Sequence, residues 1–143
     1  MKKSLFSIST KVERGDVIIT NGLVGTLKEG NEFEGYRARI LWDTGATNSA
    51  ISEKLAAKLP LQYLRHHNVE TAHGGDVSLA GYSNVSFMLV AGTAITPYAT
   101  DVSNLNGQSM DAVVGMDIIS QGVFTLEPTD DGGTRMTFTL YEQ

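Results

Sequence analysis

The sequence has no cysteine, and only three of its 143 residues are histidines. Without thiols the chain cannot form a disulfide scaffold, a thiol nucleophile, or a cysteine-based zinc or iron–sulfur site. Long apolar runs are absent as well, since none approaches the roughly 18–20 residues that a membrane-spanning helix needs. Hydroxyl side chains interrupt the apolar residues of Met1–Thr10, which disfavours a signal peptide. We therefore expect a cytoplasmic protein with no membrane partner.

Positive charge is scarce too. The 11 lysines and arginines are outnumbered by 16 aspartates and glutamates, which gives a net charge of −5. Such a chain lacks the basic surface that binds a phosphate backbone, so we do not expect nucleic acid as a partner. Its chemistry has to rest on carboxylates, hydroxyls and backbone groups. A chain of this length typically forms one domain, and we expect residues 1–143 to do so.

Proline is rare and glycine is common, with three and fifteen residues respectively. Short runs rich in Val, Ile, Thr and Phe are separated by turn residues, and this pattern predicts an all-β chain. The last two strands would form a hairpin, because the Asp130–Gly133 segment that joins them tolerates positive φ angles. The strands that we predict are Leu5–Val12, Asp16–Thr20, Tyr36–Trp42, Val69–Thr71, Val77–Leu79, Val85–Val90, Met110–Val114, Val123–Glu127 and Arg135–Tyr141.

Two segments are predicted to be helical. Ser52–Leu59 begins at a serine of the kind that caps helices, contains strong helix formers and ends before Pro60. Met116–Gln121 would form a second short helix, closed by Gly122. No linker, low-complexity tract or internal repeat divides the chain.

The most informative segment ends one of the predicted strands. Ile40–Trp42 is apolar and is followed at once by Asp43-Thr44-Gly45-Ala46. An aspartate at the end of a buried strand needs hydrogen bonds that compensate for the burial of its charge. A Thr-Gly pair offers both a hydroxyl and a backbone that can approach closely. An ordinary β-turn is the alternative interpretation, because Asp and Gly are common turn residues.

A second segment of similar design supports a functional interpretation. Ala112–Gly115 is again an apolar strand that ends in glycine, and Met116–Ile119 follows as a predicted short helix. Together the two segments resemble the retropepsins, the retroviral-type aspartic proteases, over about residues 15–128. The resemblance implies an all-β, retropepsin-like closed β-barrel or sandwich, the acid protease fold, with one or two short helices and a flap hairpin. Retroviral members carry an arginine where this chain has Met116, so we do not expect an ion pair to brace the active-site loop at this position.

The resemblance also places a flap, a β-hairpin that closes over the substrate, between the two motifs. Val69–Leu79 lies in that interval and has two extended runs around Gly74 and Gly75. Glycines suit a tip that has to bend and to lay its backbone against a peptide. An ordinary hairpin with a glycine-rich turn is the alternative.

The resemblance implies a role for individual residues. Asp43 would be catalytic, and Thr44, Gly45 and Ala46 would form the active-site loop, with Thr44 bonding to the loop of a partner chain. Val114 and Gly115 would form the structural second motif. The residues that would bind substrate are Thr47, Asn48, Ala72, His73, Gly74, Gly75, Ala112 and Val113.

Chemistry at Asp43 requires a second acid. Peptide hydrolysis without a metal, a thiol or a Ser–His pair needs one carboxylate to take a proton from water and another to protonate the amide. The chain has one Asp-Thr-Gly, and neither Asp111 nor Asp117 is followed by such a turn. We therefore expect an aspartic endopeptidase that is a two-fold homodimer, whose two Asp43 carboxylates share a proton and act on a peptide or protein substrate. The dimer contact would use the loop around Thr44 together with terminal strands such as Thr134–Tyr141, whose edges need pairing or cover.

No cofactor and no metal is expected. His66 and His67 are adjacent on an extended segment and would point to opposite faces, and no partner recurs at ligand spacing around them or around His73. Two other functions stay open. One is a catalytically weak retropepsin-like domain that serves as a dimerisation or peptide-binding module. The other is a structural β-sandwich in which the Asp-Thr-Gly sequence is a coincidence.

Overall fold

The computed structural model describes residues 2–13, 15–71, 74–105 and 109–142. These residues form two β-sheets and very little helix, so the predicted all-β class is confirmed. The strands are β1 (Ser4–Glu13), β2 (Ile19–Leu27), β3 (Phe33–Trp42), β4 (Ala50–Ser52), β5 (Tyr63–Glu70), β6 (Asp76–Tyr82), β7 (Ser86–Val90), β8 (Thr93–Ile95), β9 (Thr100–Ser103), β10 (Ala112–Val114), β11 (Gly122–Pro128) and β12 (Gly133–Tyr141). The helices are α1 (Glu53–Ala56), α2 (Met116–Ile119) and the 3-10 turn η1 (Glu29–Asn31).

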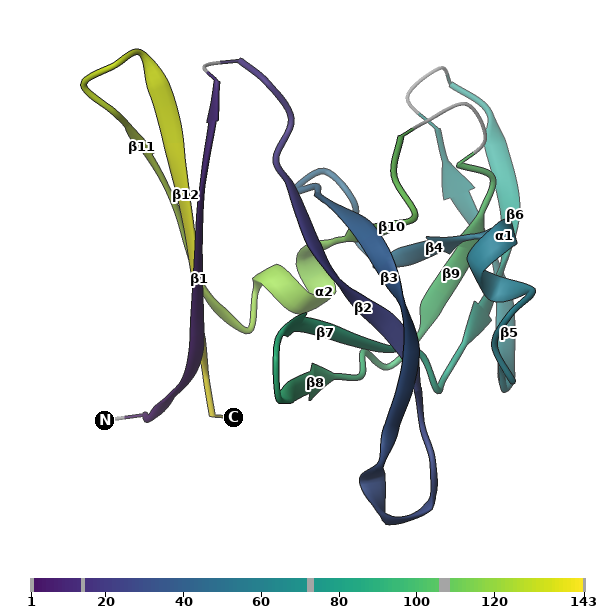
Figure 1. The fold of residues 1–143 in the computed structure, drawn as a ribbon. Coiled ribbons are helices and arrows are strands. Elements are labelled where there is room, and N and C mark those ends of the chain that lie inside the picture. Colours follow the sequence, from purple (N-terminus) through teal and green to yellow (C-terminus); the bar gives the residue numbers. More distant parts are fainter. Residues whose placement is uncertain (1, 14, 72–73, 106–108, 143) are drawn as a thin grey trace.

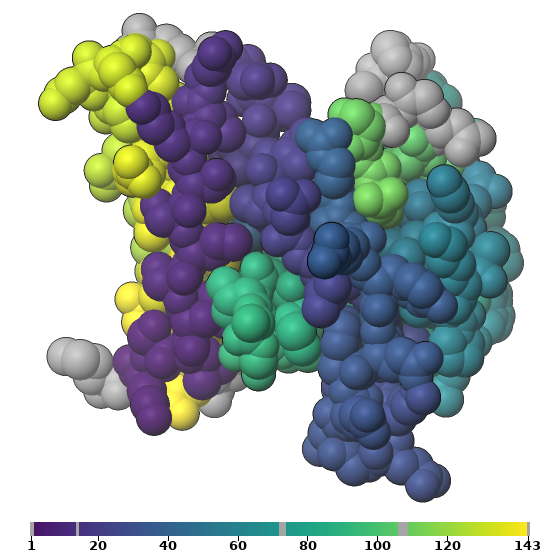
Figure 2. Space-filling model, in the orientation of Figure 1, coloured from purple at the N-terminus to yellow at the C-terminus, as the bar shows by residue number. Residues whose placement is uncertain are grey.

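The two ends of the chain form a sheet of their own, in the order β1-β12-β11 (Figure 1). β11 and β12 make the predicted hairpin, whose turn places Gly132 at a φ of 87°, a conformation that glycine tolerates. β1 pairs with β12 from Ser4, opposite Tyr141, to Glu13, opposite Gly133. In the space-filling view the N-terminal and C-terminal strands lie side by side along one flank of the molecule (Figure 2).

The edges of Thr134–Tyr141, which we expected to need pairing or cover, are paired within the chain. β12 is the central strand of the terminal sheet, and β1 and β11 occupy both of its edges. Within the part of the chain that the structure describes, the unpaired edges of this sheet belong to β1 and β11.

The other sheet is long and curled, with the order β5-β6-β9-β4-β10-β3-β2-β7-β8. β3 and β10 run parallel at its middle, with Ile40 opposite Ala112 and Trp42 opposite Val114. Each of these strands ends at one of the two motifs found in the sequence. The sheet therefore brings together two segments that are far apart along the chain.

Several strand boundaries differ from the prediction. Of the expected Asp16–Thr20 strand only Ile19 and Thr20 are in a strand, at the start of β2. Of the expected Val69–Thr71 strand only Val69 and Glu70 are, at the end of β5. Glycines inside β2 hide its length: a Cβ at Gly22 would lie 2.8 Å from the Met88 carbonyl oxygen, so glycine permits close strand approach there instead of marking a turn. The short strands β4, β8 and β9 were not predicted.

Both predicted helices are present, and both are shorter than expected. α1 covers part of Ser52–Leu59, and Ser52 caps it by accepting a hydrogen bond from the Leu55 amide at 3.1 Å. α2 ends at Ile119, earlier than the expected Met116–Gln121. Gly122 does not close this helix but begins β11.

Aromatic packing joins the terminal sheet to the long sheet. Phe138 on β12 is fully buried, and its ring centroid lies 5.2 Å from that of Trp42 and 6.1 Å from that of Phe6. Phe124 on β11 stacks on Trp42, with centroids 6.1 Å apart. Because Trp42 directly precedes Asp43, this cluster holds the strand end that carries the aspartate.

We expect Phe138→Ala to lower the free energy of unfolding by about 3–5 kcal/mol, because removal of a buried ring loses apolar contacts and leaves a cavity. Val123→Ala is the control, since Val123 is 51% exposed on β11. It should change the free energy of unfolding by less than about 0.5 kcal/mol. Urea denaturation at one fixed protein concentration measures both variants, and equal effects would contradict the role of the aromatic cluster.

Candidate active site

β3 delivers Asp43 to the edge of the core. The Trp42 side chain points inward, where its indole Nε1 donates a hydrogen bond to Thr20 Oγ1 at 2.9 Å. Side chains alternate along a strand, so the next residue faces the other way, and Asp43 is half-buried. The Asp43 amide donates to the Val114 carbonyl at 2.9 Å, which keeps this strand end attached to β10.

The Asp43-Thr44-Gly45-Ala46 segment forms a tight turn around its own carboxylate. The Gly45 amide donates to Asp43 Oδ1 at 2.8 Å, and the Ala46 amide donates to the Asp43 carbonyl at 3.2 Å. A Cβ at Gly45 would lie 3.2 Å from the same Oδ1, so glycine lets the backbone approach the carboxylate. Asp43 Oδ2 and the exposed Thr44 hydroxyl form no hydrogen bond with another residue that the structure describes.

The second motif holds this loop through the backbone. The Met116 amide donates to the Ala46 carbonyl at 2.7 Å, and the Asp117 amide donates to the Thr47 carbonyl at 3.1 Å. A Cβ at Gly115 would lie 2.7 Å from the Ala46 carbonyl oxygen, so a larger residue would push the two segments apart. This close contact explains why the apolar strand ends in glycine.

Asp117 adds a side-chain brace that the sequence pattern did not reveal. Its carboxylate accepts hydrogen bonds from the Ser49 amide at 2.9 Å and from the Ser49 hydroxyl at 2.7 Å. Ser49 Oγ in turn accepts a bond from the Gly115 amide at 3.0 Å. Met116, which stands in place of the retroviral arginine, is 37% exposed. An acidic residue in the first turn of a predicted helix is the signal that could have pointed to Asp117.

A cavity of about 510 Å³ opens beside Asp43. Its walls come from the active-site loop, from the stem of the β5–β6 hairpin, and from β9, β10 and the segment that follows β9. The lining residues are Asp43, Gly45, Ala46, Thr47, Asn48, Ala50, His67, Asn68, Val69, Glu70, Leu79, Asp101, Ser103, Leu105 and Val113.

Some of the predicted site residues line this cavity, and others do not. Thr44 lies at the exposed tip of the loop, and Gly74 and Gly75 are exposed at the tip of the hairpin, so none of the three lines the cavity. Ala72 and His73 lie outside the described residues. Six predicted site residues do line it, namely Asp43, Gly45, Ala46, Thr47, Asn48 and Val113.

The prediction that Ala112 binds substrate is corrected by its position. Ala112 is 0% exposed and belongs to the hydrophobic core. Side chains alternate along β10, so Ala112 and Val114 face the core, whereas Val113 faces the cavity. Val114 and Gly115 are buried, as their predicted structural role requires.

The cavity wall also contains polar residues that the sequence did not point to. His67 Nε2 lies 2.7 Å from Asp101 Oδ1, although the two residues are 34 positions apart in the chain. His66 faces the other way, and its Nδ1 lies 2.6 Å from the Tyr63 hydroxyl. No local pattern marks a partner at such a separation. Among the residues that the structure describes, no cluster of three or more His, Asp or Glu side chains could hold a metal ion.

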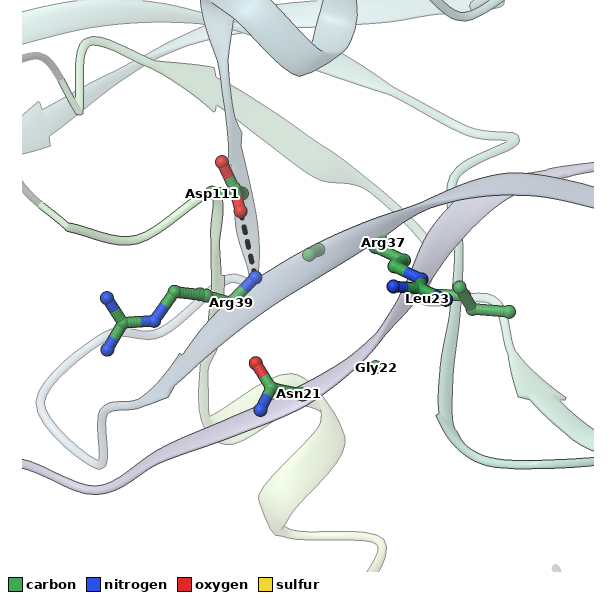
Figure 3. A pocket seen from close by; sticks show the side chains of 7 residues that line it. Asn21, Gly22, Leu23, Arg37, Arg39 and Asp111 are labelled. Atoms are coloured by element: carbon green, nitrogen blue, oxygen red, sulfur yellow. Dashed lines mark hydrogen bonds between the residues drawn. The ribbon is translucent and has the colours of Figure 1, made fainter.

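The other acids near the second motif are not placed like Asp43. Asp111 lines a separate cavity of about 590 Å³, where its Oδ2 accepts a hydrogen bond from the Arg39 amide at 2.8 Å (Figure 3). The side chains of Arg37 and Arg39 point away from one another in this cavity, so they do not converge on one ligand (Figure 3). Asp117 is bonded to the active-site loop. Asp43 is therefore the carboxylate that an Asp-Thr-Gly turn presents to the 510 Å³ cavity, whose wall also contains Glu70 and Asp101.

This combination of fold and loop defines an aspartic protease domain of the retroviral type. The chain belongs to the family described as gag-polyprotein putative aspartyl protease, whose sequence model matches residues 31–121. Those residues contain both motifs and the hairpin between them.

The fold has a counterpart among solved structures. The chain is similar to a retropepsin-like aspartic protease from Rickettsia conorii, with a TM-score of 0.51, 17% sequence identity and 96% of each chain covered. The likeness confirms the predicted retropepsin-like fold. A search of curated proteins finds no match to the chain. No helix in the described ranges is long and apolar enough to cross a membrane.

We expect Asp117→Asn to lower the free energy of unfolding by about 1–3 kcal/mol, because the amide replaces a carboxylate oxygen that accepts a bond from Ser49. Ser49 is 0% exposed, so no water can replace the lost acceptor. Asp130→Asn, in the exposed turn before β12, is the matched control and should change the free energy by less than about 0.5 kcal/mol. Urea denaturation compares the two, and a loss no larger than the control's would show that the brace contributes little.

Proposed function

We propose that this protein is an aspartic endopeptidase that works as a homodimer, with one Asp43 from each copy in the catalytic pair. The observation that carries the proposal is the single Asp43 carboxylate, held by the Gly45 amide beside a cavity of about 510 Å³. Asp111 and Asp117 accept hydrogen bonds from Arg39 and Ser49, and Asp101 in the cavity wall is bonded to His67. We therefore take the second acid to be the Asp43 of another chain. The matched family and the similar Rickettsia conorii protein are both described as aspartic proteases, which supports the proposal.

In the proposed dimer the two Asp43 loops meet at the two-fold axis. Two carboxyl groups this close do not both ionise, because their negative charges would repel each other. The pair therefore shares one proton. The ionised carboxylate takes a proton from a water molecule, whose oxygen attacks the carbonyl carbon of the peptide bond. The protonated carboxylic acid gives its proton to the amide nitrogen as the C–N bond breaks.

The loop geometry supports a distinct part for each residue. The Gly45 amide fixes Asp43 Oδ1, which leaves Oδ2 for the water and the partner's carboxylate. The exposed Thr44 hydroxyl would bond to the partner loop across the axis. Thr47 and Asn48 would bind the substrate backbone from the cavity wall.

We propose that the β5–β6 hairpin is the flap. Val69 and Leu79 in its stem line the cavity, and its turn contains Gly74 at a φ of 86°. The hairpin continues past the two positions at which β6 pairs with β9, so its outer backbone can lie along an extended peptide. The expected substrate is therefore a peptide or an extended protein segment.

A retropepsin-like dimerisation or peptide-binding module with little activity is the competing function. Two carboxylates facing one another at an axis repel each other and lose hydration, which costs free energy. A binding module has no use for such a pair, and the intact Asp43-Thr44-Gly45-Ala46 turn favours the enzyme. Family membership removes the third interpretation, in which the Asp-Thr-Gly sequence is a coincidence.

Asp43→Asn tests the catalytic role. The amide keeps the size of the side chain but can neither accept the proton of water nor share one across the axis. We expect turnover on a mixed peptide library to fall by at least about 10²-fold, while the dimer survives. Wild-type protein that dimerises and binds extended peptides as well as the variant does, yet cleaves none of them between about pH 3 and 8, would assign the binding function instead.

Mixing the same variant with wild-type subunits tests the shared site. After subunit exchange at equal amounts, only about a quarter of the dimers keep two Asp43 residues, so activity per wild-type subunit should fall to about half. A chain that works alone would keep its full activity in the mixture. Analytical ultracentrifugation of each sample confirms the association state.

The pH dependence of hydrolysis is a separate prediction. A pair that must hold one proton is inactive when it holds two or none, so the rate should follow a bell-shaped curve with its maximum on the acid side of neutrality. Steady-state cleavage across a series of buffers measures the curve. A flat profile between about pH 4 and 9, or inhibition by a chelator, would contradict the carboxylate pair.

A further inference from the structure

The flap hairpin is joined to the body of the long sheet over a short distance. β6 pairs with β9 at two positions, Gly81 opposite Asp101 and Tyr82 opposite Thr100. The hairpin pairing continues from there to Glu70 opposite Asp76. The outer part of the hairpin thus extends past the last residue pair that binds it to β9.

His67 lies in this outer part and reaches back to the body. It sits opposite Leu79, beyond the last β6–β9 pair, and its Nε2 lies 2.7 Å from Asp101 Oδ1 on β9. The side chain of His67 is 23% exposed and that of Asp101 is 5% exposed. A buried carboxylate needs a hydrogen-bond donor, and His67 supplies it.

The strand between them leaves room for this contact. A Cβ at Gly81 would lie 3.4 Å from Asp101 Oδ1 and 3.5 Å from Arg65 Cγ. A longer side chain at Gly81 would therefore fill the space that separates β5 from the carboxylate on β9. The glycine allows side chains on β5 to reach across β6.

Asp101 is also bonded to the segment that follows the active-site loop. Its amide donates to the Ser49 carbonyl at 3.0 Å, and Ser49 is the residue that Asp117 braces. Asp101 and His67 both line the cavity that contains Asp43. One residue of β9 thus binds the loop through its backbone and the flap through its side chain.

We propose that His67 is a positioning residue, whose hydrogen bond to Asp101 holds the flap stem against the cavity in the arrangement that grips the substrate. This proposal rests on the proposed endopeptidase function and adds a residue that acts through the flap. Because a flap contacts the substrate in the ground state and the transition state alike, loss of the tether raises KM more than it lowers kcat.

The kinetic test compares three variants. His67→Leu removes the donor and keeps similar bulk, and we expect KM to rise roughly tenfold with kcat within about twofold. His67→Gln keeps a nitrogen donor at a similar reach and should restore KM to within about threefold of wild type. His66→Leu is the matched control, because its neighbour is Tyr63 in the same strand and it does not line the cavity. An unchanged KM in His67→Leu, or no restoration by His67→Gln, would overturn the proposal.

Hydrogen exchange tests the tether without any activity. In substrate-free protein, amides of residues 66–70 and 76–80 should exchange faster in His67→Leu than in wild type, and His66→Leu should match wild type. Equal exchange in all three proteins would overturn the tether. If wild-type protein cleaves no peptide, the endopeptidase proposal fails, and faster exchange in His67→Leu alone still supports the tether.

Discussion

The hydrogen bonds between Asp117 and Ser49 are the constraint on which the site depends. Ser49 is fully buried, so each of its polar atoms needs a partner inside the protein. Its amide and hydroxyl donate to the Asp117 carboxylate, its Oγ accepts from the Gly115 amide, and its carbonyl accepts from the Asp101 amide. One serine therefore joins the segment after Asp43 to α2, to the end of β10 and to β9. Because the buried Ser49 hydroxyl needs both of these partners, the segment that contains it has to stay in place, and this limits the positions that the Asp43 loop can adopt.

The parallel pair of β3 and β10 provides the frame for that constraint. Side chains alternate along these strands, and Ile40, Ala112 and Val114 on the face that packs on the core are 0% exposed. The aromatic cluster around Trp42 ties the end of β3 to the terminal sheet. Asp43 directly follows β3, and its backbone position is fixed because the packed strand before it is held on both sides by its neighbours. The packing of the core thus determines where the Asp43 carboxylate lies.

The sequence predicted the parts of this architecture whose signals are local. The Asp43 turn, the strand-glycine-helix pattern around Gly115 and the Asp130–Gly133 hairpin each depend on a few adjacent residues, and the structure has all three elements. It could not reveal β4 or β9, because a strand of three or four residues exists only through its pairing with distant neighbours. Asp117 and His67 were missed for the same reason. Their partners, Ser49 and Asp101, are remote in the chain, and no local pattern shows which residue each side chain will bond.

The polar groups of the Asp43 loop are hydrogen-bonded on one side of the loop and not on the other. On the side that faces the core, the Asp43 amide, the Ala46 and Thr47 carbonyls and the Ser49 hydroxyl all have partners. On the outer side, Asp43 Oδ2 and the Thr44 hydroxyl form no hydrogen bond within the described chain. A loop that served only as a connection would have no need to be held so firmly from one side, since turns on a surface are usually solvated and variable. Firm support from the core, with bonding capacity left on the outer face, is the arrangement that the proposed dimer requires, because in it the loop of a second chain would have to meet groups that are already in position.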